Sequence, residues 1–124
     1  LSRAAKLQKR ASQVGFDWPS ALPVVDNVRE ELDEVLEAMA DNDSAAIADE
    51  VGDLLFAAVN LARHLKVDPE TALRGANAKF ERRFRFIEQA LRDTHQPIED
   101  CTLEVLDALW GEAKRQEKNV SSCG

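Results

Sequence analysis

Two short stretches of the sequence decide the fold, 28-VREELDEVLE-37 and 49-DEVGDLLFAAVN-60. In both stretches the apolar residues recur with the 3.6-residue period of an amphipathic helix, and we expect these apolar stripes to form the core. Each stretch also carries two carboxylates three residues apart, Glu31 with Glu34 and Glu50 with Asp53. The fold therefore has to accommodate two helices with matching acidic pairs.

The helical pattern continues along the rest of the chain, and no strand pattern competes with it. We expect helices at residues 2–14, 24–40, 44–65 and 69–93, and a last helix from about Leu103 that fades near Lys118. Asp43 or Ser44 is the expected N-cap of the third helix, and Asp68 precedes Pro69 at the start of the fourth. Gly52 lies inside a helix at a cost of roughly 1 kcal/mol, which predicts a closely approaching backbone.

These elements predict an all-α fold: a bundle of four to five helices built around an antiparallel hairpin that carries the acidic motifs. With 124 residues, the chain is long enough for one domain, which we place at residues 1–118. Residues 119–124 lack periodicity, and we expect them to form a disordered tail.

The composition limits the partners of this chain. Its formal net charge is −7, which argues against nucleic acid or an anionic membrane as the main partner, since both attract cationic surfaces. Cys101 and Cys123 lie far apart and form no metal-binding motif. The sequence shows no signal peptide or transmembrane run, so we expect a cytoplasmic protein. Because it begins at Leu1 and not at Met, a fragment or a processed form of a longer protein is an open interpretation, and the sequence does not decide it.

The two acidic pairs are expected to meet in three dimensions. The short connection 41-DNDS-44 makes the two long helices antiparallel neighbours. At about 100° per residue, the first acid of each pair lies about 80–90° from its apolar stripe and the second about 140–150°. Both pairs are also equally distant from the connection. The four carboxylates should therefore converge at one height on one side of the hairpin.

Convergence of four carboxylates indicates a divalent cation site. Two like charges about 4 Å apart repel by about 1 kcal/mol in water and about 4 kcal/mol at an effective dielectric constant near 20. An all-oxygen set of ligands suits Mg²⁺, with Mn²⁺ as a possible substitute. Di-iron bundles use Glu-x-x-His, and neither His64 nor His95 has that spacing. The alternative is a solvated acidic surface, to which we assign Asp33, Glu37 and Asp49.

A local basic cluster, 77-NAKFERRF-84, stands out in this acidic chain. Its side chains Lys79, Arg82 and Arg83 share one helix face and suit phosphate oxygens, and Asn77 could contact a base or sugar. The alternative is ion pairing with Glu81, Glu88 or the acidic helices.

These motifs resemble the MazG nucleoside triphosphate pyrophosphohydrolases, an all-α family. The resemblance rests on EELDE, DEVGDLLFAAVNLARHL and NAKFERRF, and extends to KLQKRASQVGFDW and LWGEAKRQE near the two ends. The resemblance covers nearly the whole chain. The chain is similar to the C-terminal MazG unit of longer bacterial proteins.

The resemblance implies a homodimer that hydrolyses NTPs or dNTPs to the nucleoside monophosphate and pyrophosphate with Mg²⁺. It implies metal ligands at Glu31, Glu34, Glu50 and Asp53, phosphate contacts from Lys79, Arg82 and Arg83, and nucleotide contacts from Trp110 and Lys114. Trp110 fits the core equally well. Glu31, Glu34 and the adjacent Glu30 remain alternative acceptors for the proton of the attacking water.

Two other functions stay open. The acidic motif also occurs in related pyrophosphohydrolases that act on phosphoribosyl-ATP or on dUTP and dCTP. The second open function is a non-enzymatic helical interaction module, in which the acids are solvated surface residues. Base preference, the number of metal ions and the physiological role cannot be read from the sequence.

Overall fold

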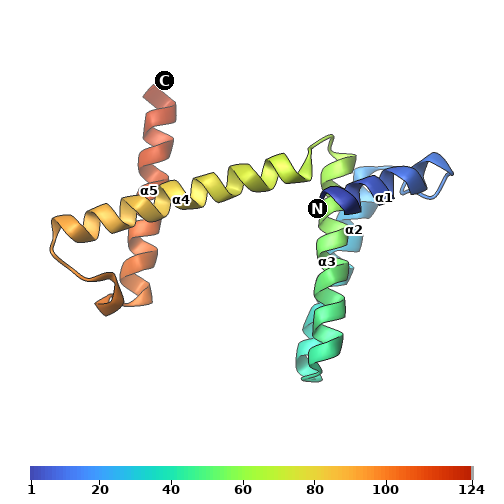
Figure 1. Ribbon diagram of the computed structural model, residues 1–124, viewed down its shortest axis with the longest axis horizontal. Coiled ribbons are helices and arrows are strands. Elements are labelled where there is room, and N and C mark those ends of the chain that lie inside the picture. The colour runs from blue at the N-terminus through green and yellow to red at the C-terminus, as the bar shows by residue number, and fades with distance from the viewer. Residues whose placement is uncertain (124) are drawn as a thin grey trace. The chain divides into compact units, whose positions relative to one another are not determined.

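The computed structural model describes the backbone of residues 1–123 and the side chains of residues 1–118. The described residues are helical and contain no strand, which confirms the all-α prediction (Figure 1). The elements are α1 (Ser2–Gln13), α2 (Ala21–Ala40), α3 (Ser44–His64), α4 (Pro69–Asp93), the 3-10 helix η1 (Ile98–Asp100) and α5 (Leu103–Cys123).

Two helix bounds differ from the sequence prediction. Helix α2 starts at Ala21 and includes Pro23. The first turn of a helix tolerates proline, because a backbone N–H at that position would have no partner within the helix. Helix α5 continues past Lys118 to Cys123. The disordered tail predicted at residues 119–124 stays a prediction, and the structure gives the backbone of residues 119–123 as the end of α5.

The turn between α2 and α3 forms the predicted hairpin. The Asp43 carboxylate caps α3 by accepting from the backbone N–H groups of Ala45 at 3.1 Å and Ala46 at 3.2 Å. Asn42, at φ 54°, takes the left-handed conformation that asparagine tolerates better than most residues. Helices α2 and α3 consequently pack side by side, and α1 packs against α3.

The chain divides into two compact units, one from Leu1 to Leu73 and one from Arg74 onward. The single domain predicted at residues 1–118 stays a prediction. In the first unit the buried apolar side chains are Val24, Ala38, Ala57 and Val59. In the second unit they are Ile87, Leu91 and Ala113. Both cores are small for the apolar content of the sequence.

The apolar stripe of the hairpin is not buried as predicted. Leu36 and Met39 on α2 are 53% and 57% exposed, and Leu55 on α3 is 55% exposed. The fully buried side chains of α2 are Val24 and Ala38, whereas Val28 and Val35 of the apolar stripe are half-buried. The approach predicted at Gly52 is also wrong, since a Cβ there would meet nothing within 4 Å among the described residues.

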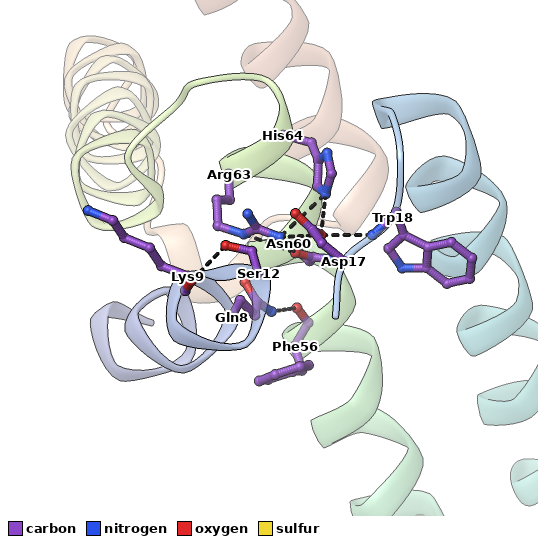
Figure 2. A network of polar contacts seen from close by, with 9 residues as sticks. All are labelled: Gln8, Lys9, Ser12, Asp17, Trp18, Phe56, Asn60, Arg63 and His64. Atoms are coloured by element: carbon purple, nitrogen blue, oxygen red, sulfur yellow. Dashed lines mark hydrogen bonds and ion pairs between the residues drawn. The ribbon is translucent and has the colours of Figure 1, made fainter. Parts of the chain in front are cut away.

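A polar network fastens the loop at residues 14–20 to α3 (Figure 2). The Arg63 guanidinium donates to Asp17 Oδ1 at 2.6 Å, and His64 Nε2 lies 2.9 Å from the same oxygen. Asn60 Oδ1 accepts from Arg63 Nη2 at 2.8 Å. The hydrogen bond from Arg63, assisted by His64 and the Trp18 backbone against the opposing effect of burial, lowers the pKa of Asp17 to about 2.

Asp17→Asn should lower the free energy of unfolding at pH 7 by about 1–2 kcal/mol, because a partly exposed charge-assisted contact is lost. The folded pKa of Asp17 lies below its ordinary value of 3.8, so its stabilisation is complete above about pH 4 and is lost as pH falls toward 2. Urea unfolding between pH 2 and 7 checks this, with Asp107→Asn as control. If the stability of Asp17→Asn fell between pH 4 and pH 2 as steeply as that of the wild type, this role of Asp17 would be contradicted.

Candidate metal centre

Three carboxylates meet in the seam between α2 and α3. Glu31, Glu50 and Asp53 each present one oxygen, and these oxygens all lie within 4.8 Å of one another. Glu31 and Glu50 are half-buried, whereas Asp53 is exposed. The antiparallel hairpin brings the residues together, because α2 and α3 run past each other at the height of the acidic pairs.

Glu34 is the fourth member of the cluster. It stands close enough to share a proton with Glu50, and this interaction is the largest cause that raises the pKa of Glu50 to about 7. Burial and the charges of Glu34, Asp53 and Asp49 act in the same direction. The pKa of Glu31 is also raised, first by burial and then by the charges of Glu34 and Asp53. The four acids thus converge as the helical geometry predicts.

The cluster has the features of an oxygen-ligand cation site. Glu31 Oε2 and Glu50 Oε2 are buried and have no hydrogen-bond partner among the described residues. A buried unpaired carboxylate oxygen costs free energy, and cation coordination removes that cost. Because every donor is a carboxylate oxygen, the set fits a hard cation such as Mg²⁺ or Mn²⁺. The ligand assignment of the four residues stays a prediction.

One residue of this site was missed from the sequence. Asn27 lies one helical turn before Glu31, and its side-chain amide faces the Glu31 carboxyl and works to lower its pKa. The same i, i+4 arithmetic that placed the acids could have identified it. Glu30, the third candidate for the proton acceptor, is exposed on α2.

The residues predicted to contact substrate lie in the second unit. Arg83 Nε donates to Glu117 Oε2 at 3.1 Å, and Arg82 Nε lies 3.7 Å from Glu117 Oε1. The Arg83 guanidinium also stands over the Trp110 ring, 5.3 Å from its centroid. Asn77, Lys79 and Lys114 are exposed.

The ion pairs of this unit differ from the alternative considered from the sequence. Glu117 of α5 is the acid that pairs with both arginines, whereas Glu81 lies 4.0 Å from Arg85. Trp110 is half-buried and its ring centroid lies 5.4 Å from that of Phe80, so it contributes to packing within this unit. Arg83 is therefore held rigidly by an acid and an aromatic ring.

The MazG nucleotide pyrophosphohydrolase domain matches residues 20–86, which is more than half of the chain and includes all four acids. The chain belongs to the MazG family. It is 51% identical over 119 residues to the nucleoside triphosphate pyrophosphohydrolase of Escherichia coli (strain K12), covering 94% of this chain and 45% of the relative. It therefore spans less than half the length of that relative.

Two further relatives come from other bacteria. The nucleoside triphosphate pyrophosphohydrolase/pyrophosphatase MazG of Thermotoga maritima is 45% identical over 114 residues, which is 92% of this chain and 44% of that protein. The uncharacterized protein YabN of Bacillus subtilis (strain 168) is 48% identical over 69 residues, which is 56% of this chain and 14% of that protein. None of the helices in the described part of this MazG chain combines the length and hydropathy of a membrane span.

The raised pKa of Glu50 predicts an unusual pH dependence for the cation-free protein. The folded state keeps a proton on Glu50 up to about pH 7, whereas the unfolded chain releases it near 4.5. The folded state thus binds more protons between these values, and stability should fall as pH rises from 5 to 8. Because a cation competes with the proton, saturating Mg²⁺ should flatten or reverse this slope.

Urea unfolding in EDTA and in Mg²⁺ at pH 5, 6, 7 and 8 measures both slopes. The Glu50→Gln variant, which cannot titrate at this position, serves as the control and should show a shallower slope in EDTA. A cation-free stability that rises steadily from pH 5 to 8 would contradict the arrangement.

Proposed function

We propose that this chain hydrolyses nucleoside triphosphates, NTPs or dNTPs, to the monophosphate and pyrophosphate in a Mg²⁺-dependent reaction. The observation that carries the proposal is the four-carboxylate cluster with two unpartnered buried oxygens in a member of the MazG family. Relatives at 51% and 45% identity are named for this activity. An all-oxygen cluster is also the type of site that holds Mg²⁺ together with phosphate oxygens.

The acidic residues have two roles in this proposal. Glu31, Glu50 and Asp53, assisted by Glu34, hold the cation. When bound, Mg²⁺ would neutralise charge on the triphosphate and would make a water molecule at the site more acidic. Glu34 is the proposed proton acceptor, because it stands beside the three converging oxygens without belonging to them. The water oxygen bonds to the α phosphorus, its proton passes to the carboxylate, and the bond to the bridging oxygen breaks to release pyrophosphate.

The basic residues of the second unit are the proposed phosphate ligands. Lys79 is exposed, while Arg83 is held by Glu117 and Trp110. Preorganised cations of this type stabilise charge that develops on the leaving pyrophosphate. Further contacts are proposed for Asn77, Arg82, Trp110 and Lys114.

We also propose that the functional form is a homodimer. Leu36 and Met39 on α2 and Leu55 on α3 each expose about half of their surface, and Gly52 leaves open space beside them on α3. Large exposed apolar faces of this kind mark association surfaces. A second copy of the hairpin offers the same apolar surface and can form a two-fold interface.

Pyrophosphate release from each of the eight common NTPs and dNTPs with Mg²⁺ tests the activity. Glu50→Gln should lower turnover by on the order of 100-fold, since it removes one cation ligand and its charge. Glu37→Gln, an acid to amide change on the exposed face of α2, is the matched control and should keep wild-type turnover.

Three outcomes separate the alternatives. Turnover of several triphosphates supports the proposal. Turnover of dUTP or dCTP alone, or of phosphoribosyl-ATP in place of the eight, assigns the chain to a narrower pyrophosphohydrolase. If no pyrophosphate is released from any of these nucleotides and Glu50→Gln binds Mg²⁺ like the wild type, the interaction module is the remaining function.

Light scattering tests the dimer. The wild type should have the mass of two chains, and Leu36→Glu should shift it toward one chain, because a charge would be buried in the interface. Glu37→Leu is the control at the neighbouring position and should leave the mass unchanged. A wild-type mass equal to one chain at micromolar concentration would rule out the dimer.

A further inference from the structure

A cavity of about 310 Å³ lies between α1 and the turn that joins α3 to α4, within the first unit. Its lining consists of Ala5, Lys6 and Lys9 of α1, Arg63 near the end of α3, and residues 66–69, where the turn enters α4. None of these residues belongs to the acidic cluster. The volume lies at the lower end of the range of about 300–1,000 Å³ that is usual for small-molecule sites.

The charge of this cavity lining is opposite to that of the whole chain. The lining contains four cationic residues, Lys6, Lys9, Arg63 and Lys66, and one acidic residue, Asp68. The chain as a whole has a formal net charge of −7. Like charges around one cavity repel each other, and an anion would remove that repulsion. The lining therefore favours an anionic ligand.

Three of the four cationic groups are available to a ligand. Lys6, Lys9 and Lys66 are exposed, and their ammonium groups have no ion-pair partner among the described residues. Figure 2 shows the Lys9 side chain directed away from the Asp17 network. Arg63 differs from the lysines, because its guanidinium is bonded to Asp17 at 2.6 Å. The three lysines are therefore the groups that can move onto an anion.

The acidic residue of the lining has a structural role. Asp68 Oδ2 accepts from the backbone N–H of Thr71 at 3.1 Å and from the Thr71 hydroxyl at 2.6 Å. The Asp68 carboxylate thereby caps the start of α4, where a negative charge also suits the helix dipole. Capping accounts for this acid, whereas no structural contact of the described residues accounts for the three ammonium groups.

Lys66 has a backbone conformation that lysine rarely adopts. It follows the C-cap of α3 and has φ 63°. The Val67 N–H donates to the Ala62 carbonyl oxygen at 2.9 Å, and the Lys66 N–H donates to that of Arg63 at 3.1 Å. These two bonds form a Schellman motif, in which glycine is usual at the left-handed position. A lysine Cβ crowds the backbone there, so the side chain at this position lowers stability, and a role in binding would explain it.

We propose that this cavity binds a polyphosphate anion, held by the ammonium groups of Lys6, Lys9 and Lys66. Lysine is a common ligand of phosphate oxygens, and three lysines suit an anion that carries several charges. Inorganic tripolyphosphate and the phosphates of a nucleotide share this chemistry. The site is independent of the proposed reaction, because it needs neither the acidic cluster nor a cation.

Binding would link two segments that are far apart in the sequence. Lys6 and Lys9 lie on α1, whereas Lys66 follows α3. A ligand that binds only the folded state raises the free energy of unfolding. Tripolyphosphate should therefore move the urea midpoint of the cation-free protein upward as its concentration rises.

Calorimetry with inorganic tripolyphosphate in EDTA tests the site in the full chain, because the cation-free acidic cluster repels anions. Lys6→Gln and Lys9→Gln should each raise the Kd by about 5-fold, as expected for the loss of one exposed ion pair. Arg3→Gln removes a positive charge from an exposed position of α1 outside the cavity. It is the matched control and should bind tripolyphosphate like the wild type.

Lys66→Gly should change stability and affinity in opposite directions. Without a ligand, its urea midpoint should be higher than that of the wild type, because glycine suits the left-handed position. Its Kd for tripolyphosphate should nevertheless rise by about 5-fold. An unchanged Kd in this more stable variant would overturn the proposal.

Lys79→Gln separates this cavity from the phosphate contacts proposed in the second unit. In EDTA it should keep the wild-type Kd for tripolyphosphate. Weaker binding by Lys79→Gln, with wild-type binding by the three cavity variants, would overturn the proposal. Absence of tripolyphosphate binding at millimolar concentration would overturn it as well.

ATP in EDTA identifies the source of the phosphates. A Kd equal to that of tripolyphosphate, raised equally by Lys9→Gln, supports a site that recognises phosphates alone. A lower Kd for ATP with the same dependence on Lys9 supports a nucleotide as the ligand. Binding of ATP that is independent of Lys6, Lys9 and Lys66 would contradict both assignments.

Discussion

The mutual repulsion of four carboxylates in one helix seam is the constraint on which the rest of the structure depends. Glu31, Glu34, Glu50 and Asp53 lie where α2 and α3 pack, a place that a stable hairpin would ordinarily fill with apolar side chains. The hydrogen bond with Glu34, burial and the neighbouring charges raise the pKa of Glu50 to about 7, and two buried carboxylate oxygens have no partner among the described residues. A cation resolves both features at once, so stability and function are coupled at the same atoms.

Much of the apolar stripe of the hairpin is exposed. Leu36 and Met39 on α2 and Leu55 on α3 each expose about half of their surface. The first unit therefore has a small core, and the exposed stripe needs another surface to cover it. The hairpin thus presents both a cluster of carboxylates and an exposed apolar stripe, and the proposed dimer interface would cover the stripe.

Much of this structure could be predicted from the sequence because helical periodicity and caps are local. The helices, the Asp43 cap and the convergence of the acids follow from residue spacing. Which side of each helix forms the seam could not be predicted, because an amphipathic stripe can face a neighbour in the chain or another surface. The Asp17 network was also missed, since it joins residues far apart in the sequence.

The most direct test of the central claim is whether Glu50→Gln raises or lowers the free energy of unfolding, measured without and with Mg²⁺. Urea unfolding of the wild type and Glu50→Gln is compared at pH 8 in EDTA and in saturating Mg²⁺. The variant should be more stable than the wild type in EDTA, because a repelling charge is removed. It should be less stable in Mg²⁺, since a ligand at about 100 times its Kd stabilises the wild type by about 2.7 kcal/mol. A variant that is less stable by the same amount in both conditions would contradict the account.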